Sequence, residues 1–160
     1  MKRILTIFML LCLLLSGCSL FTSDEWDPIL FYYRRGSYLM GSSDGAIAPE
    51  ERDGTGHITD MDYLLRLYLT GPHDEELVSP FPADVQLTSV RTGQNIVTVS
   101  LSGSPEGLSE AAKTLACACL TLTCLDIADE ESVMIFWGEE IITMDESCLT
   151  LFDSSTATTE

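Results

Sequence analysis

Histidine, cysteine and carboxylate side chains are the groups in this 160-residue sequence that could perform chemistry. His57 and His73 each lie beside acidic residues in stretches that we expect to be loops, an arrangement that suits a general acid/base pair. Histidines exposed on loops have the same surroundings, and we favour that simpler interpretation. A hydrolase that uses His57 or His73 therefore stays open only as the weakest of three function classes.

Cys117, Cys119 and Cys124 lie close together in the sequence and suggest a metal site. On a helix, however, residues two apart point about 200° away from each other and residues seven apart are separated by ~10 Å along the axis. Those separations are too large for one tetrahedral ion with ~2.3 Å bonds to sulfur. We therefore expect buried thiols that pack as small apolar residues, and we predict no metal and no cofactor. A disulfide from Cys148 to one of the three stays open.

Carboxylates also occur in three short runs, at residues 74–76, 129–131 and 139–140. Each run could collect calcium weakly, but none has the alternating Asp/Asn and the central glycine of an EF-hand loop. We expect solvated turns, while weak cation binding by the acidic surface stays open.

The N-terminal residues have the pattern of an export signal. Lys2 and Arg3 precede an apolar stretch over residues 4–15, as in a signal peptide. As a helix this stretch would rise only ~18 Å, well short of a ~30 Å hydrocarbon core, so we expect no permanent span.

The end of that stretch, Leu15-Ser16-Gly17-Cys18, resembles the lipobox of bacterial lipoprotein precursors. In such proteins the cysteine receives a diacylglyceryl group and becomes the first residue, and two acyl chains give stable membrane retention. We therefore predict a lipoprotein signal peptide over residues 1–17 and a lipidation site at Cys18, with the protein on the extracytoplasmic face of the cell membrane. The alternative is an ordinary secretory signal with a chance cysteine.

The charge balance excludes two classes of partner. Without Lys2 and Arg3 the chain keeps six of its eight basic side chains against 25 acidic ones, a formal charge of −19. So acidic a body repels nucleic acid and anionic lipid headgroups alike. Membrane association must then come from the lipid.

Two helices are expected to organise the domain. Met61, Leu64, Leu65 and Tyr68 recur at helical spacing, with Thr59 or Asp60 as the cap and Gly71-Pro72 as the stop. A second helix should begin after Ser109, which caps it, and run to about Leu122. We list the residues expected on its buried face: Ala112, Leu115, Cys119 and Leu122.

Strands are predicted around these helices. They are expected at 29–33 (with 38–40 a possible continuation), at 85–90 and 96–101 as a hairpin around 91–95, and at 133–137 and 141–142 as a last hairpin. Residues 41–56 read as a loop, with 48–52 a short ordered piece inside it. The order predicts an α+β fold: a small, mostly antiparallel sheet with two helices packed on one face.

The expected boundaries give one domain over residues 29–152, preceded by a tether at 18–28 and followed by a disordered tail at 153–160. Within this domain several segments resemble the GerMN domain of sporulation and spore germination. The segments that carry the resemblance are Ala48-Pro49-Glu50-Glu51-Arg52, Leu67-Tyr68-Leu69-Thr70-Gly71-Pro72, Leu77-Val78-Ser79-Pro80-Phe81-Pro82, Val97-Thr98-Val99-Ser100-Leu101-Ser102, Thr121-Leu122-Thr123 and Phe136-Trp137-Gly138. It covers about residues 29–142. Many relatives carry paired domains, whereas this sequence has one copy.

The resemblance implies a non-catalytic extracytoplasmic assembly module, and no catalytic or ligand residues are attributed to the domain. We therefore predict a lipid-anchored interaction module of the sporulation or germination envelope machinery, without an enzymatic activity, a cofactor or a small-molecule substrate. Its partners would be other extracytoplasmic envelope proteins, met through the strand at 85–90 if that strand lies at a sheet edge. The alternative is a general acidic envelope lipoprotein that binds cations or cell-wall material. The partner, the stage and the oligomeric state stay open.

Overall fold

The computed structural model describes residues 27–37 and 45–149 of the chain. Predictions for the signal peptide, Cys18, most of the tether, residues 38–40 and the C-terminal tail therefore lie outside the described residues. Within them, none of the helices is long and apolar enough to cross a membrane.

The first sheet is built on the predicted N-terminal strand. β1 (Pro28–Arg35) pairs antiparallel with β2 (Ile47–Asp53) along its length and with β3 (Leu77–Val78) at its end, which gives the order β2-β1-β3. Ile29, Phe31 and Tyr33 alternate along β1 and are buried. One face of this sheet therefore belongs to the core.

The second sheet contains the two predicted hairpins, β4 (Leu87–Gly93) with β5 (Ile96–Leu101) and β6 (Ser132–Trp137) with β7 (Glu140–Asp145), in the order β4-β5-β6-β7. β5 and β6 are parallel, so the chain must cross over between them, and a helix makes that crossover. Gln94 and Asn95 have φ of 59° and 62°, as the tight two-residue turn of the first hairpin requires.

Both predicted helices are present. α2 (Met61–Leu69) is capped by Asp60, buries the four predicted residues and stops at Gly71, whose φ is 96°. α3 (Glu110–Ile127) is capped by Ser109, as predicted, but continues five residues beyond Leu122. A short helix, α4 (Glu146–Leu149), follows β7.

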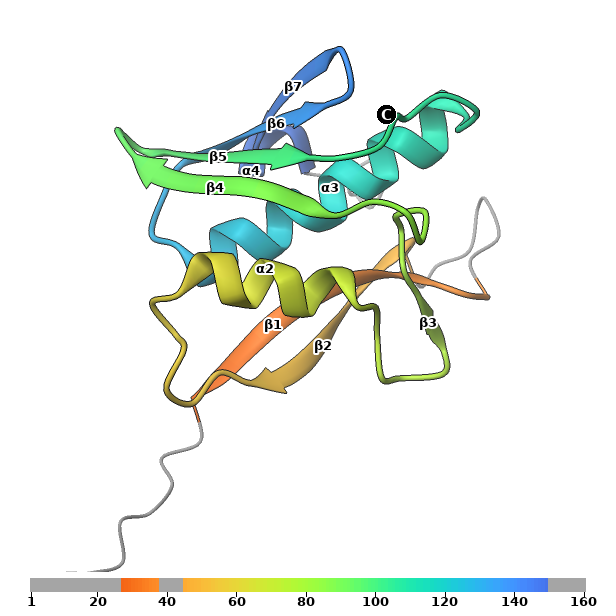
Figure 1. Ribbon diagram of the computed structural model, residues 1–160. Helices are drawn as coiled ribbons and strands as arrows, with labels where there is room; N and C mark the ends of the chain where they lie inside the picture. The colour runs from red at the N-terminus through yellow and green to blue at the C-terminus, as the bar shows by residue number, and fades with distance from the viewer. Residues whose placement is uncertain (1–26, 38–44, 150–160) are drawn as a thin grey trace, which may run out of the picture.

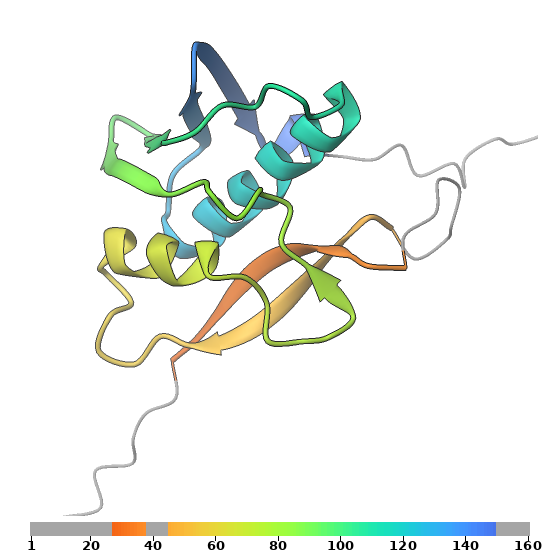
Figure 2. The same ribbon diagram turned by 45° about the vertical axis from the view of Figure 1, so that its right-hand side comes forward.

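The helices form a middle layer between the two sheets (Figures 1 and 2). α3 packs against β1 on one side and against β6 and β7 on the other, while α2 lies along β4. A column of rings crosses this layer: Tyr68 stacks on Tyr33 with centroids 4.9 Å apart, and Phe81 packs between Tyr68 and Trp137. One aromatic core therefore joins both sheets.

This arrangement corrects the buried face predicted for α3. Of the four residues expected there, only Cys119 is buried, whereas Ala112 is exposed and Leu115 and Leu122 are half-buried. Because sheets cover the helix from two sides, every residue from 116 to 121 is buried. Alanine and cysteine at four of these positions keep the helix thin enough for both sheets to approach.

The α+β class and the general order of elements are confirmed, and three details differ. The strand expected at 85–90 runs over residues 87–93, so the turn of the first hairpin is residues 94–95 instead of the expected 91–95. The strands divide into two sheets with the helices between them, instead of one sheet with helices on one face. Residues 48–52, expected as a short piece in a loop, belong to the seven-residue strand β2. This polar strand is stable because Ala48 and Arg52 turn inward and Arg52 is paired with Glu50.

Candidate binding groove and the Arg52 cluster

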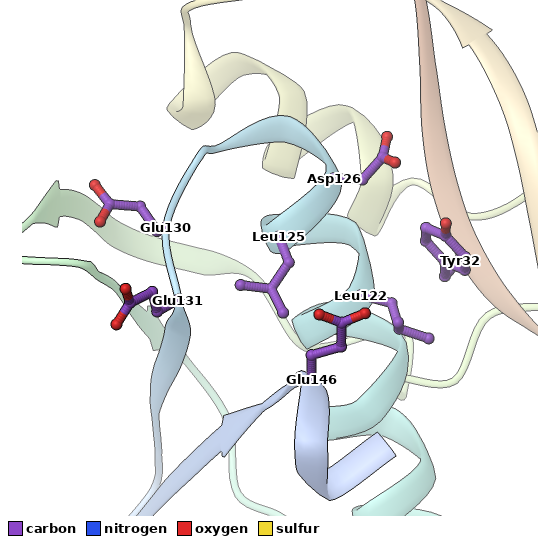
Figure 3. A pocket seen from close by; sticks show the side chains of 7 residues that line it. All are labelled: Tyr32, Leu122, Leu125, Asp126, Glu130, Glu131 and Glu146. Carbon is purple, nitrogen blue, oxygen red and sulfur yellow. The ribbon is translucent and has the colours of Figure 1, made fainter. Parts of the chain in front are cut away.

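A groove opens where the C-terminal part of α3 meets β1 and α4 (Figure 3). It is an open surface pocket with a volume of about 420 Å³. The side chains that line it are Tyr32, Leu122, Leu125, Asp126, Glu130, Glu131 and Glu146. Three of them are large and half-buried, with mostly apolar surfaces, and four are carboxylates.

Hydrogen bonds between β1 and α3 set the floor of the groove. The backbone N–H of Tyr32 donates to Oγ1 of Thr123 at 2.9 Å, and that of Leu30 donates to Oδ2 of Asp126 at 3.2 Å. Side chains of α3 thereby satisfy the edge of β1 that β3 leaves unpaired. Tyr32 is consequently held against the helix face that carries Leu122.

The acidic rim is positioned by the ends of two other elements. The N–H groups of Glu131 and Ser132 donate to the carbonyl of Asn95, at 3.1 and 3.2 Å, so the turn after α3 is held against the β4–β5 hairpin. Glu146 begins α4, and its side chain extends toward Leu122 and Leu125 of α3 (Figure 3). The groove is therefore framed by backbone contacts that do not depend on a bound partner.

The groove offers apolar contact and negative charge. Of the residues that the structure describes, those lining the groove include no basic side chain and no histidine, serine or cysteine. Burial, followed by the nearby Asp126 carboxylate, raises the pKa of Tyr32, so its hydroxyl stays neutral at physiological pH. These groups suit recognition of a positively charged, partly apolar surface better than bond-breaking chemistry.

The sequence did not indicate this groove. We expected Glu130 and Glu131 in a solvated turn and Leu122 on the buried face of α3. Tyr32 and Thr123 are 91 residues apart, and only the folded chain places them together.

A second cluster joins two segments that carry the family resemblance. Arg52 is 7% exposed and pairs with Glu50 on the same strand, β2. It also donates to the carbonyl oxygen of Gly71 at 3.0 Å and to Nε2 of His73 at 2.9 Å. Glu50 in turn accepts from the backbone N–H groups of His73 and Asp74, each at 2.9 Å. The two charged residues thus fasten β2 to the loop that ends α2.

The two histidines do not form the acid/base pair considered above. His57 lies before α2, where its ring stacks on Tyr63 with centroids 3.8 Å apart, and His73 lies beyond the other end of the helix. Because a guanidinium has only donors, Nε2 of His73 is the acceptor of this hydrogen bond from Arg52. His73 therefore has a structural partner.

The cysteines of α3 are buried, as predicted. Burial raises the pKa of Cys117 to about 11 and that of Cys119 to about 12, and it raises the pKa of Cys124 further. All three are free thiols, as is the exposed Cys148 of α4. Within residues 27–37 and 45–149, no three histidine, cysteine or acidic side chains gather as a metal site would require.

Replacing Glu50 with glutamine is expected to remove part of the acid sensitivity of folding. Burial alone would raise the pKa of Glu50, but hydrogen bonds from Asp74, Arg52 and His73 outweigh it and lower the pKa below its usual 4.5. A group with a lowered folded pKa stabilises the fold above its unfolded pKa, and this contribution disappears as the pH falls through the folded value.

The measurement is chemical denaturation of both proteins from about pH 7 down to about pH 3. Wild type should be the more stable at neutral pH, and the difference in free energy of unfolding should shrink below pH 4.5. A difference that is constant across this range would contradict the assignment of the shift to Glu50.

Comparison with known proteins gives one family match and two matches among solved structures. The family model described as Germane, sporulation and spore germination, matches residues 38–138. Among solved structures, the tandem GerMN domains of the sporulation protein GerM from Bacillus subtilis match with a TM-score of 0.49 and 17% identity, over 72% of this chain and 40% of that one. A Clostridium perfringens protein described as a proposed lipoprotein matches with a TM-score of 0.47 and 16% identity, over 76% and 89% of the two chains.

This chain therefore spans less than half the length of the tandem-domain protein. No curated protein matches the sequence.

Proposed function

Because this chain belongs to the Germane family of sporulation and spore-germination proteins, we propose that it is a lipid-anchored, non-catalytic module that binds another protein outside the cytoplasmic membrane. The observation that carries the proposal is the groove between β1, α3 and α4. Tyr32, Leu122 and Leu125 present apolar surface there that water solvates poorly and that a partner would cover.

Membrane anchoring is proposed through Cys18. Its support is the lipobox-like Leu15-Ser16-Gly17-Cys18 after a short apolar stretch. The strongly acidic chain, with a formal charge of −17, has no electrostatic attraction to an anionic bilayer, so a covalent lipid is the more plausible anchor.

The second function class, an acidic envelope lipoprotein that collects cations or wall material, has one observation in its favour. Four carboxylates line a single groove. The apolar floor beneath them favours a protein partner instead, because a hard cation is held by converging oxygen ligands. Calcium titration followed by calorimetry separates the two classes: saturable calcium binding that is lost with the groove carboxylates would support the cation-binding class.

The proposed function is tested by affinity purification from sporulating and vegetative cells. A double variant, Leu122→Ala with Leu125→Ala, should recover less of a specific envelope protein than wild type from sporulating cells. Val78→Ala with Ile141→Ala, which truncates exposed apolar side chains elsewhere, is the matched control and should recover as much as wild type.

Variants at β4 test the alternative contact surface. β4 is an edge strand, as expected for that region, but α2 lies along its beginning and Arg66 donates to the carbonyl of Leu87 at 3.3 Å. Thr88→Lys should therefore leave partner recovery unchanged. If Thr88→Lys loses the partner but Leu122→Ala with Leu125→Ala does not, the partner binds at the sheet edge and not in the groove.

A further inference from the structure

The chemistry of the groove restricts what it can bind, starting with its floor. Leu122 and Leu125 of α3 line the groove and are both half-buried, and Leu125 also packs against the hydrophobic core. Tyr32 adds an amphipathic ring beside them. A pocket of about 420 Å³ lies within the range of ligand sites, at its lower end, and suits a few apolar side chains.

The rim adds a charge requirement. Asp126, Glu130, Glu131 and Glu146 stand around this floor, and none of the lining residues that the structure describes is a cation that could neutralise them. A partner that covered the floor would bring its own surface against these carboxylates and partly desolvate them. Burying uncompensated charge is costly, so a complementary partner carries cations at the edge of its apolar contact.

A second copy of this chain is a poor candidate for the partner that occupies the groove. Each copy carries 25 acidic against eight basic side chains, two of which lie in the proposed signal peptide. Three of the remaining basic residues, Arg52, Arg66 and Lys113, are already paired with carboxylates of their own chain. Nucleic acid and anionic lipid are excluded by the same charge.

We infer that the groove binds an apolar protein segment that carries lysine or arginine beside its hydrophobic residues. The inference rests on the proposed function and names the chemistry of its partner. The hydrophobic residues lie on Leu122 and Leu125, and the cations lie against the carboxylates of Glu130, Glu131 and Glu146. Tyr32 donates a hydrogen bond to Thr123, and the carbonyl of Asn95 accepts hydrogen bonds from the turn after α3, so these walls of the groove are in place before a partner binds. Binding therefore loses little conformational entropy.

Synthetic peptides test this inference with the purified full-length protein in nonionic detergent. A fluorescein-labelled peptide of alternating leucine and lysine pairs should bind, and binding should weaken as salt rises. Replacing its lysines with glutamates or its leucines with serines should each abolish or strongly reduce binding. Equal binding of the serine peptide would overturn the apolar part of the inference.

Charge-matched variants distinguish the groove from the acidic body as a whole. Glu130→Gln, Glu131→Gln and Glu146→Gln together should weaken peptide binding about tenfold. The control, Glu75→Gln, Glu76→Gln and Glu106→Gln, removes the same three charges from exposed positions outside the groove and should leave binding within about twofold. If both triple variants lose the same amount of peptide affinity, the peptide is attracted by the net charge of the protein alone, and the inference is overturned.

The proposed function and the inferred chemistry of its partner can be tested separately. If no peptide binds but partner recovery from sporulating cells still depends on Leu122 and Leu125, the partner chemistry is wrong and the proposed function stands. If the peptide binds in the groove but the amount of partner recovered is the same with and without Leu122 and Leu125, the groove is not the surface that binds the partner and the proposed function is wrong at this site.

Discussion

Arg52→Ala should destabilise the domain by about 3–5 kcal/mol, because it leaves the buried Glu50 carboxylate without its cation. The side chains of Arg52 and Glu50 are only 8% and 10% exposed. The substitution also removes the donors to Gly71 and His73, so the loop after α2 loses its attachment to β2. An ordinary domain is stable by only about 5–15 kcal/mol, so a large share of the total would be lost.

Urea denaturation followed by circular dichroism measures this loss. Arg66→Ala is the matched control, because it removes the same side chain from an ion pair with Asp62 that is about half exposed, and it should cost much less stability than Arg52→Ala. Arg52→Lys keeps the charge but not the forked geometry and should fall between wild type and Arg52→Ala. If Arg52→Ala and Arg66→Ala lower the free energy of unfolding equally, the buried pair stabilises the domain no more than the exposed pair does.

Cys18→Ser should move the protein from the membrane fraction to the soluble extracytoplasmic fraction almost completely. Without the thiol no diacylglyceryl group can be attached, and the acidic body has no other affinity for a bilayer. The fold should be unaffected, because Cys18 precedes the domain that the sequence predicts over residues 29–152. Fractionation combined with metabolic labelling by a radioactive fatty acid checks both outcomes.

Cys12→Ser is the control for this experiment. Cys12 lies within the apolar stretch six residues before Cys18, so its replacement changes the leader equally little but leaves the lipobox-like sequence intact. It should keep both the label and the membrane location. Fatty-acid label that persists on Cys18→Ser would overturn the lipoprotein proposal.

Elements with local signals were predicted well. α2 carries a cap at Asp60, an apolar residue pattern of helical period and a glycine stop, and all three act within a dozen residues. The β6–β7 hairpin has strand-forming residues around Gly138, and in the first hairpin Gly93 ends β4 just before the two-residue turn. Neighbouring residues determine such features, so the sequence pattern is sufficient to find them.

α3 shows where local pattern fails. Its residues from 116 to 121 are apolar or small on every side, so a search for one buried stripe selected the wrong residues. A helix covered by sheets on two sides has no single buried face. Whether one sheet or two would form was not encoded in any local period. The assignment of Ala112 to the core was wrong because it lies in the exposed first turn of α3, before the buried stretch begins.

The sequence by itself determined the class of the fold, its principal helices and hairpins, its charge and the family resemblance that the family model supports. Its prediction of lipidation at Cys18 stays a prediction, because that segment is outside the described residues. Only the tertiary structure decided that Glu50 and Arg52 fasten the loop at Gly71 and that Tyr32 meets α3. Those contacts join residues 19 to 91 positions apart. Local sequence patterns arise from the geometry of a single helix or strand, whereas the pairing of distant segments depends on how all the buried surfaces fit together.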